Sequence, residues 1–132
     1  MRLVLQRGIG DCGLAALCTY AELSYEDAFV VMAKVERTHR GKNGVQWAHL
    51  RRVAQALGFR VRLRRTFNIN EHDGLLAVQW LPDSPHASGT FGQHLVALAD
   101  GIVADPADGV ILPVDEYLTR AKATPGALME LA

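Results

Sequence analysis

The sequence predicts an α+β fold, because helical patterns occupy the first half of the chain and strand patterns occupy the second. Its 132 residues are close to the usual size of one domain, and a 49% hydrophobic content is enough to build one core. No internal repeat or low-complexity segment interrupts this order. We therefore expect a single domain over residues 1–132, with N-terminal helices packed on an antiparallel sheet.

The first half of the chain is expected to form three helices. They are predicted at Asp11 to about Ala21, at Ser24 to about Val35 and, after a loop from Thr38 to Asn43, from Gly44 to about Leu57. Asp11 is a favoured N-cap residue, and an apolar run follows it. Ser24 is a second cap, and Glu26 and Asp27 place acids in the first turn that follows.

The second half of the chain contains short apolar runs that predict strands. They are expected at about Arg60 to Arg64, Leu75 to Trp80, Gln93 to Ala99, Ile102 to Ala104 and Gly109 to Leu112, with a short helix from Val114 to Arg120. Asp100-Gly101 is a dipeptide favoured in two-residue hairpin turns. The strands on either side of it should therefore pair antiparallel.

Cys12 is a candidate nucleophile, because it lies in the first turn of the expected first helix. A cysteine attacks as the thiolate, and its free pKa of about 8.5 must fall for that form to be abundant near neutrality. The unpaired N–H groups and the positive pole of a helix start stabilise that charge. Gln6 precedes Cys12 by six residues, and its amide can join the Cys12 N–H in donating to an oxyanion. Taken alone, the two residues have plainer interpretations, as buried packing and as solvated surface.

His94 is the candidate base, because it opens the strand that leads to the predicted hairpin turn. If Ala99 pairs with Ile102, then Asp105 lies diagonally opposite His94 on the same face, with about 7–8 Å between backbones. Asp105 is thus predicted to orient the imidazole, although a surface salt bridge would have the same spacing. The remaining histidines lie in polar or turn-rich surroundings and are expected at the surface: His39, His49, His72 and His86.

A cysteine at a helix start, a histidine on a strand and a carboxylate on the adjoining strand are the nucleophile, base and orienter of acyl transfer. The residues that carry them are Gln6, Asp11-Cys12-Gly13-Leu14-Ala15-Ala16, Gly92-Gln93-His94-Leu95-Val96-Ala97-Leu98 and Ala104-Asp105-Pro106-Ala107-Asp108-Gly109. In these segments the chain resembles the double-glycine leader peptidases that process bacteriocin precursors. These are papain-like cysteine peptidases, usually found at the N-terminus of peptide-exporting ABC transporters. A glycine-led helix ending in Leu57-Gly58-Phe59 extends the resemblance through the middle.

This resemblance implies a papain-like fold and a cysteine endopeptidase. It implies Cys12 as nucleophile, His94 as general base and acid, Asp105 as orienter and Gln6 as oxyanion donor. The substrate would be a leader peptide cut after a small pair such as Gly-Gly. Because the known relatives are fused to an exporter, we expect either that a transporter is supplied by another chain or that the substrate is something else. The polar segment Leu81 to Gln93 departs from the family and can alter substrate choice.

Two other activities remain open at this stage. The same three residues could serve a different acyl transfer, such as isopeptide cleavage, deamidation or a transglutaminase-like reaction. Alternatively, the chain could be a non-catalytic member of the same fold that only binds leader peptides. The presence of Cys12, His94 and Asp105 argues against this second alternative.

The formal net charge is zero, but its distribution along the chain is uneven. From Lys34 to Arg65 there are ten Lys or Arg residues against one acid, whereas the remainder has four against thirteen. Arg60 to Arg65 alternates so that one strand face is basic, which suits an acidic peptide. Nucleic acid is an unlikely partner, since the segment lacks aromatic stacking platforms. A solvated, protected edge strand is the simplest interpretation.

Cys12 and Cys18 are the only cysteines, and on one helix they lie more than one turn apart and on different sides. A disulfide between them is therefore not expected, and Cys18 should pack inertly beside Leu14 and Leu17. No CxxC or paired-histidine motif indicates zinc, and we expect no cofactor. Free thiols favour a reducing compartment, and no apolar run is long enough for a signal peptide or a membrane span. The expected location is the cytoplasm.

Overall fold

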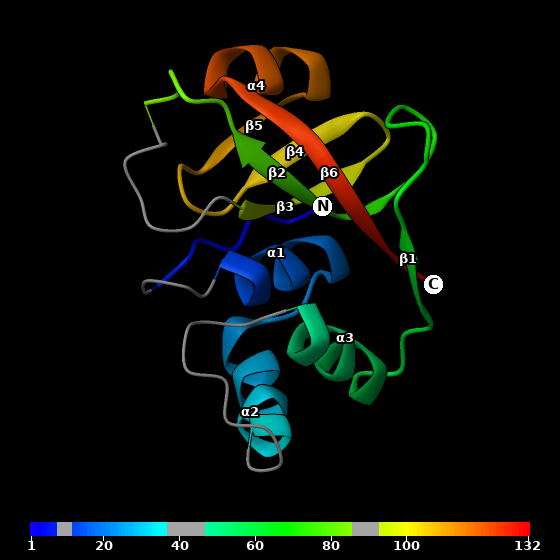
Figure 1. Cartoon of the computed structure of the whole chain (residues 1–132). Helices are drawn as coiled ribbons and strands as arrows, with labels where there is room; N and C mark the ends of the chain where they lie inside the picture. The colour runs from blue at the N-terminus through cyan, green and yellow to red at the C-terminus, as the bar shows by residue number, and fades with distance from the viewer. Residues whose placement is uncertain (8–11, 37–46, 86–92) are drawn as a thin grey trace.

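The computed structural model describes residues 1–7, 12–36, 47–85 and 93–132, which form a sheet covered by helices on both faces (Figure 1). Helices α1 (Cys12–Ala21), α2 (Tyr25–Glu36) and α3 (Trp47–Ala56) lie on one side, and α4 (Val114–Ala121) lies on the other. The strands are β1 (Val61–Arg64), β2 (Gly74–Trp80), β3 (Gln93–Ala99), β4 (Ile102–Asp105), β5 (Val110–Pro113) and β6 (Ala123–Leu131). The predicted α+β fold is confirmed.

The strands follow the order β1-β6-β2-β3-β4-β5, and all neighbouring pairs are antiparallel. The hairpin predicted at Asp100-Gly101 joins β3 to β4, with Ala99 opposite Ile102. Asp100 and Gly101 have φ angles of 52° and 73°, the positive values that a type I′ turn requires. The predicted hairpin is therefore confirmed, and it puts His94 and Asp105 on adjoining strands.

Strand β6 lies between β1 and β2 in the sheet, and the sequence did not predict it. It contains Pro125 and Gly126, two residues that usually interrupt strands. The register against β2 shifts between Leu76 and Val78, where β6 has one residue more than β2. A Cβ at Gly126 would lie 3.2 Å from the carbonyl oxygen of Ala77, so glycine permits this close approach. A β-bulge thus accommodates both residues.

The alternation of side chains along β2 separates two cores. Leu75 and Ala77 pack with the helices α1 to α3, whereas Leu76 and Val78 pack with α4. Helix α1 is buried over its whole middle, from Gly13 to Thr19, and packs on β3. Leu14, Leu17 and Cys18 are buried as predicted, and the residues between them are buried too, because the helix is covered by the sheet and by its neighbouring helices. This packing fixes the start of α1 against β3.

The prediction that His49 lies at the surface is wrong. His49 is only 7% exposed, because it lies on the inner face of α3 beside Leu50, and Val53 lies one turn further on. The helical period, and not the polarity of its sequence neighbours, determines its burial. Several predictions fall outside the described residues: those on Asp11, His39, His86, the loop from Thr38 to Asn43, and most of the segment from Leu81 to Gln93.

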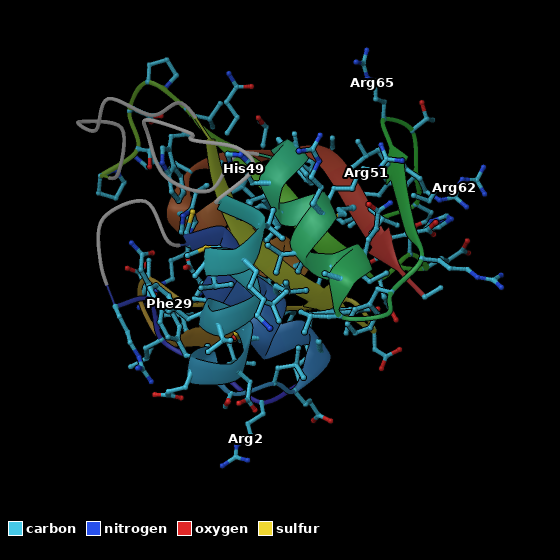
Figure 2. The ribbon with its side chains drawn as sticks, turned by 90° about the horizontal axis from the view of Figure 1, so that it is seen from below. Arg2, Phe29, His49, Arg51, Arg62 and Arg65 are labelled. Carbon is cyan, nitrogen blue, oxygen red and sulfur yellow. The ribbon has the colours of Figure 1, made fainter. Side chains whose placement is uncertain are left out.

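The basic strand β1 lies at one end of the strand order, as expected for an edge strand. Arg64 forms an ion pair of 2.7 Å with Glu130 of the adjacent β6. Figure 2 shows Arg62 and Arg65 projecting outward, with Arg51 of α3 on the same flank. This arrangement fits the interpretation of a protected, solvated edge. None of the helices in the described ranges has the length and apolar character that crossing a bilayer requires.

Candidate active site

Cys12 is the first residue of α1, so its sulfur lies beside the N–H groups that begin the helix. The thiol is half-buried and is hydrogen-bonded to the imidazole of His94 and to backbone groups of Gly13 and Leu95. Burial raises the pKa of Cys12, but these hydrogen bonds and the charge of His94 bring it below the ordinary value. The surroundings of Cys12 therefore favour the thiolate.

His94 is linked to Asp105 through the adjoining strands β3 and β4. Nε2 of His94 lies 2.8 Å from Oδ1 of Asp105, and the two residues are 9% and 1% exposed. Because Nε2 donates to the acid, Nδ1 is the nitrogen left for the thiol of Cys12. Burial lowers the pKa of His94, but its bonds to Asp105 and Cys12 and their charges raise it to about 9. A thiolate and an imidazolium can therefore coexist near neutral pH.

Asp105 receives three hydrogen bonds. Its Oδ1 also accepts the N–H of Ala107 at 2.9 Å, and its Oδ2 accepts the hydroxyl of Tyr117 at 2.6 Å. Burial raises the pKa of Asp105, but the bonds to His94, Tyr117 and Ala107 lower it overall. Burial and the charge of Asp105 raise the pKa of Tyr117, so its hydroxyl stays a donor. The carboxylate is thus ionised and fixed in direction.

Trp80 covers one face of the imidazole. Its ring centroid lies 5.3 Å from that of His94, and the two planes differ by 22°. The face of an indole attracts a cation, so this stacking also favours the imidazolium. The sequence placed Trp80 and Tyr117 only in a strand and a short helix. The sequence assigned neither residue a role, because no local spacing shows which polar group an aromatic residue contacts.

Gln6 lies in the N-terminal segment, residues 1–7, which runs beside the same group. Its backbone N–H donates to the carbonyl of Pro106 at 2.9 Å, and its side chain is half-buried. Pro106 directly follows Asp105, so this bond attaches the segment to the turn that carries the acid. The structure thus brings Cys12, His94 and Asp105 together and anchors the backbone of Gln6 at the turn after Asp105. The catalytic roles of all four residues remain predictions.

Cys18 differs from Cys12 in every respect that controls reactivity. It is completely buried, and its thiol donates weakly to the carbonyl of Ser24 over 3.7 Å. Burial and the charge of Glu26 raise its pKa to about 11. Both cysteines are free, as predicted. In the described ranges, no group of three or more His, Cys, Asp or Glu side chains is placed to hold a metal ion.

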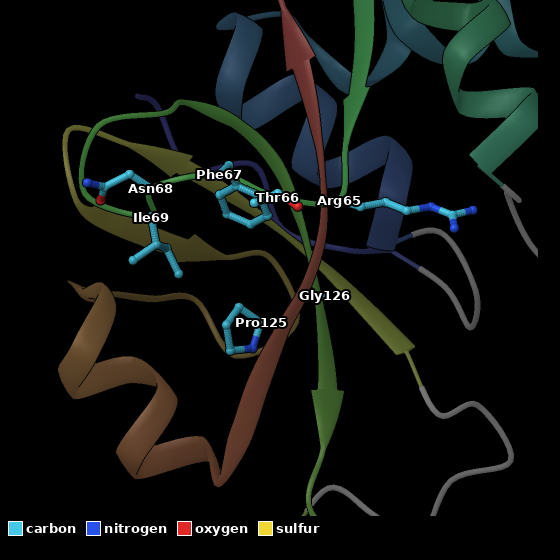
Figure 3. A pocket seen from close by; sticks show the side chains of 7 residues that line it. All are labelled: Arg65, Thr66, Phe67, Asn68, Ile69, Pro125 and Gly126. Atoms are coloured by element: carbon cyan, nitrogen blue, oxygen red, sulfur yellow. The ribbon is translucent and has the colours of Figure 1, made fainter.

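Other hollows lie elsewhere on the described part of the molecule, including one of about 500 Å³ between the N-terminal segment and the start of α2. Another, of about 830 Å³, lies between the loop after β1 and the bulge of β6 (Figure 3) and is lined by Arg65, Thr66, Phe67, Asn68, Ile69, Pro125 and Gly126. It contains no acid and no nucleophile suited to acyl transfer. A third hollow, of about 380 Å³, is lined partly by Tyr117 and Arg120. Its wall thus includes the tyrosine whose hydroxyl binds Asp105. The chemistry therefore concentrates at Cys12, His94 and Asp105.

Comparison with known proteins was made at the levels of sequence and structure. No protein-family model matches the chain, and no curated protein matches it. The peptidase domain of Streptococcus ComA, described as a bi-functional ABC transporter involved in a quorum-sensing pathway, has a similar structure. Its TM-score is 0.62 at 19% identity, and the match covers 99% of this chain and 97% of that one.

The peptidase domain of Streptococcus mutans ComA is also similar, with a TM-score of 0.57 and 18% identity. That match covers 100% of this chain and 99% of the other. The fold expected from the resemblance to leader peptidases is therefore confirmed: the chain has the fold of the ComA peptidase domains.

Proposed function

We propose that this chain is a cysteine endopeptidase that hydrolyses a peptide bond through a thioester acyl-enzyme. The observation that carries the proposal is the hydrogen-bonded series from Cys12 through His94 to Asp105, in which the ionised thiol and the protonated ring are favoured. The shared fold of the ComA peptidase domains supports the same activity. In this proposal residues 1–132 act as one peptidase domain.

Acylation begins when the thiolate of Cys12 attacks the carbonyl carbon of the scissile bond. The carbonyl oxygen becomes an oxyanion, which accepts hydrogen bonds from the Cys12 N–H and the side-chain amide of Gln6. As the carbon–nitrogen bond breaks, Nδ1 of His94 gives its proton to the leaving amine. A thioester remains on Cys12, and His94 is left neutral. Asp105 stays ionised throughout and holds the ring in the orientation that this transfer needs.

In deacylation, His94 first accepts a proton, whereas in acylation it donates one. Nδ1 of His94 takes a proton from a water molecule as its oxygen attacks the thioester carbon. The same donors stabilise the second oxyanion, and its collapse breaks the carbon–sulfur bond. The carboxylic acid product leaves, and the thiolate of Cys12 and the imidazolium of His94 are restored. The stacked indole of Trp80 and the acid both favour this resting state.

The proposed substrate is a leader peptide cleaved after a Gly-Gly-type pair. This part of the proposal follows the resemblance to leader peptidases and the transporter context of the ComA domains. It implies association with a peptide-exporting ABC transporter, and we propose no nucleic-acid partner. The cytoplasm is the proposed location, because a thiolate nucleophile needs reducing surroundings to stay active.

The test is incubation of the protein with a precursor peptide whose leader ends in Gly-Gly. Mass spectrometry should detect two fragments whose summed mass exceeds that of the precursor by one water. Cys12→Ala should abolish cleavage, whereas Cys18→Ala, the matched control in the same helix, should keep it. A single product of altered mass would instead indicate deamidation or transglutamination.

The same experiment tests the substrate preference and the identity of the nucleophile separately. If the precursor stays intact while a thiol reagent still labels Cys12, the Gly-Gly preference is rejected and the nucleophile is retained. If Cys12→Ala keeps full biological activity, the chain is a binding protein and the proposed enzyme is rejected.

A further inference from the structure

Thr19 is a completely buried polar residue that the mechanism above does not use. It lies on α1, two turns after Cys12 and on the same side of the helix. Its Oγ1 accepts the N–H of Val4 at 2.9 Å, and it lies 2.9 Å from the carbonyl of Ala15 and 3.3 Å from that of Val4. A hydroxyl has one hydrogen, so the shorter contact, to Ala15, takes it. The oxygen of Thr19 is then the acceptor that binds the N-terminal segment to the helix of the nucleophile.

The same segment has a second attachment two residues further on. The N–H of Gln6 donates to the carbonyl of Pro106, the residue after Asp105. Between these points, Leu5 packs against Gly109, where an added Cβ would lie 3.3 Å from a methyl group of Leu5. One short stretch of backbone is therefore tied at Val4 to the helix that begins with Cys12, and at Gln6 to the turn that follows the acid.

We propose that Thr19 is a positioning residue, which sets the place of the Gln6 side chain relative to Cys12. The inference rests on the proposed function, because Gln6 is an oxyanion donor only if Cys12 attacks a carbonyl. Without the acceptor at Thr19, the N–H of Val4 loses its partner. Two other polar attachments of the segment are the bond of Gln6 to Pro106 and the ion pair of Arg7 with Glu26, and neither of them involves α1. A shift of about 1 Å is enough to weaken a donor aimed at an oxyanion and to lower the rate. Thr19 itself touches no reacting atom.

The test compares Thr19→Val, which removes the hydroxyl at nearly constant shape, with Thr19→Ser, which keeps it. With the precursor as substrate, kcat of Thr19→Val should fall about ten- to a hundredfold, whereas KM should change little. Thr19→Ser should retain most of the wild-type kcat. The rate at which iodoacetamide alkylates Cys12 should be the same in all three proteins, because that displacement forms no oxyanion.

A double-mutant cycle shows whether Thr19 acts through Gln6. Gln6→Ala alone should lower kcat about 10²- to 10³-fold, as expected for one oxyanion donor. In that background, Thr19→Val should cause no further loss, because the group that it positions is already absent. An equal loss of kcat in both backgrounds would overturn the inference, and so would slower alkylation of Cys12 in Thr19→Val.

Two other possibilities have to be distinguished: that Thr19→Val does not fold, and that the proposed function is wrong. If Thr19→Val does not fold, Val4→Pro removes the same hydrogen bond from the donor side, since proline has no N–H. It should reproduce the loss of kcat, and unchanged kcat would overturn the inference. Failure of the proposed function gives a different pattern: the wild-type protein would cleave nothing, or Cys12→Ala would remain active.

Discussion

Removal of the Tyr117 hydroxyl tests how the acid is held in this site. The hydroxyl donates to Oδ2 of Asp105 at 2.6 Å, and His94 and Ala107 share the other oxygen. Tyr117→Phe removes only this donor and leaves the ring in its core with Val114 and Ala121. The carboxylate of Asp105 then loses the hydrogen bond that fixes its rotation.

The expected loss of stability follows from the burial of Asp105. Asp105 is 1% exposed, so water does not readily replace the lost donor, and the stability should fall by about 1–3 kcal/mol. For a chain of this length that corresponds to a fall in Tm of roughly 4–12 °C. A carboxylate that is free to rotate orients His94 for less of the time, so kcat should fall about tenfold.

The pH dependence of the stability change has a definite sign. Tyr117 helps to lower the pKa of Asp105, and a lowered carboxyl pKa stabilises the fold above the unfolded value of about 3.9. This contribution is lost as the pH falls through the pKa of the folded state. The difference in Tm between the wild type and Tyr117→Phe should therefore be largest near neutrality and shrink in acid.

Thermal unfolding and precursor cleavage measure these two effects. Tyr20→Phe is the matched control, because the half-buried Tyr20 makes no hydrogen bond through its hydroxyl to the described residues. The control should keep the wild-type kcat and lose little stability. If Tyr117→Phe keeps the Tm and kcat of the wild type, or if both variants lose the same amount, the reasoning about Asp105 is refuted.

Three other outcomes are expected. Iodoacetamide should label Cys12 and spare Cys18, whose pKa is raised to about 11, and peptide mapping with equal labelling of both would contradict this assignment. The profile of kcat/KM against pH should rise as Cys12 ionises and fall near pH 9, where His94 loses its proton; a plateau beyond pH 10 would argue against the ion pair. Gly74→Ala should unfold at much lower urea concentration than Gly58→Ala. Both positions have positive φ, but a Cβ at Gly74 would lie 2.1 Å from a carbonyl oxygen of β6, whereas nothing lies within 4 Å at Gly58, and equal midpoints would refute the clash.

The parts of the fold that were predicted have local causes. Asp100-Gly101 adopts two positive φ angles that few other dipeptides tolerate, so the turn and its register could be read directly. Ser24 caps α2 as expected, with its Oγ accepting the N–H of Asp27 at 3.1 Å. The pairing of His94 with Asp105 followed from that turn by counting residues. These features depend on neighbours within about a dozen positions.

The parts that were missed depend on residues far apart in the sequence. Strand β6 looked interrupted at Pro125 and Gly126, and only its bulged pairing with β2 explains why it continues. Tyr117 was placed only within a short helix, and nothing in the local sequence showed that its hydroxyl would donate to Asp105. Trp80 likewise gave no sign of which ring it would cover. The pattern of apolar and polar residues predicts which positions are buried. Which residues these buried side chains contact depends on how the strands are arranged in the folded sheet.

The position of β6 also affects when the sheet can form during synthesis. This strand is synthesised after the other elements of the domain, yet it joins β1 to β2, which have no direct pairing with each other. Until it is translated, the core under α1 to α3 lacks Met129 and Leu131, and β1 lacks the strand with which it pairs. We therefore expect the sheet to close only once β6 has been made, so that a nascent chain that stops before β6 lacks a stable fold.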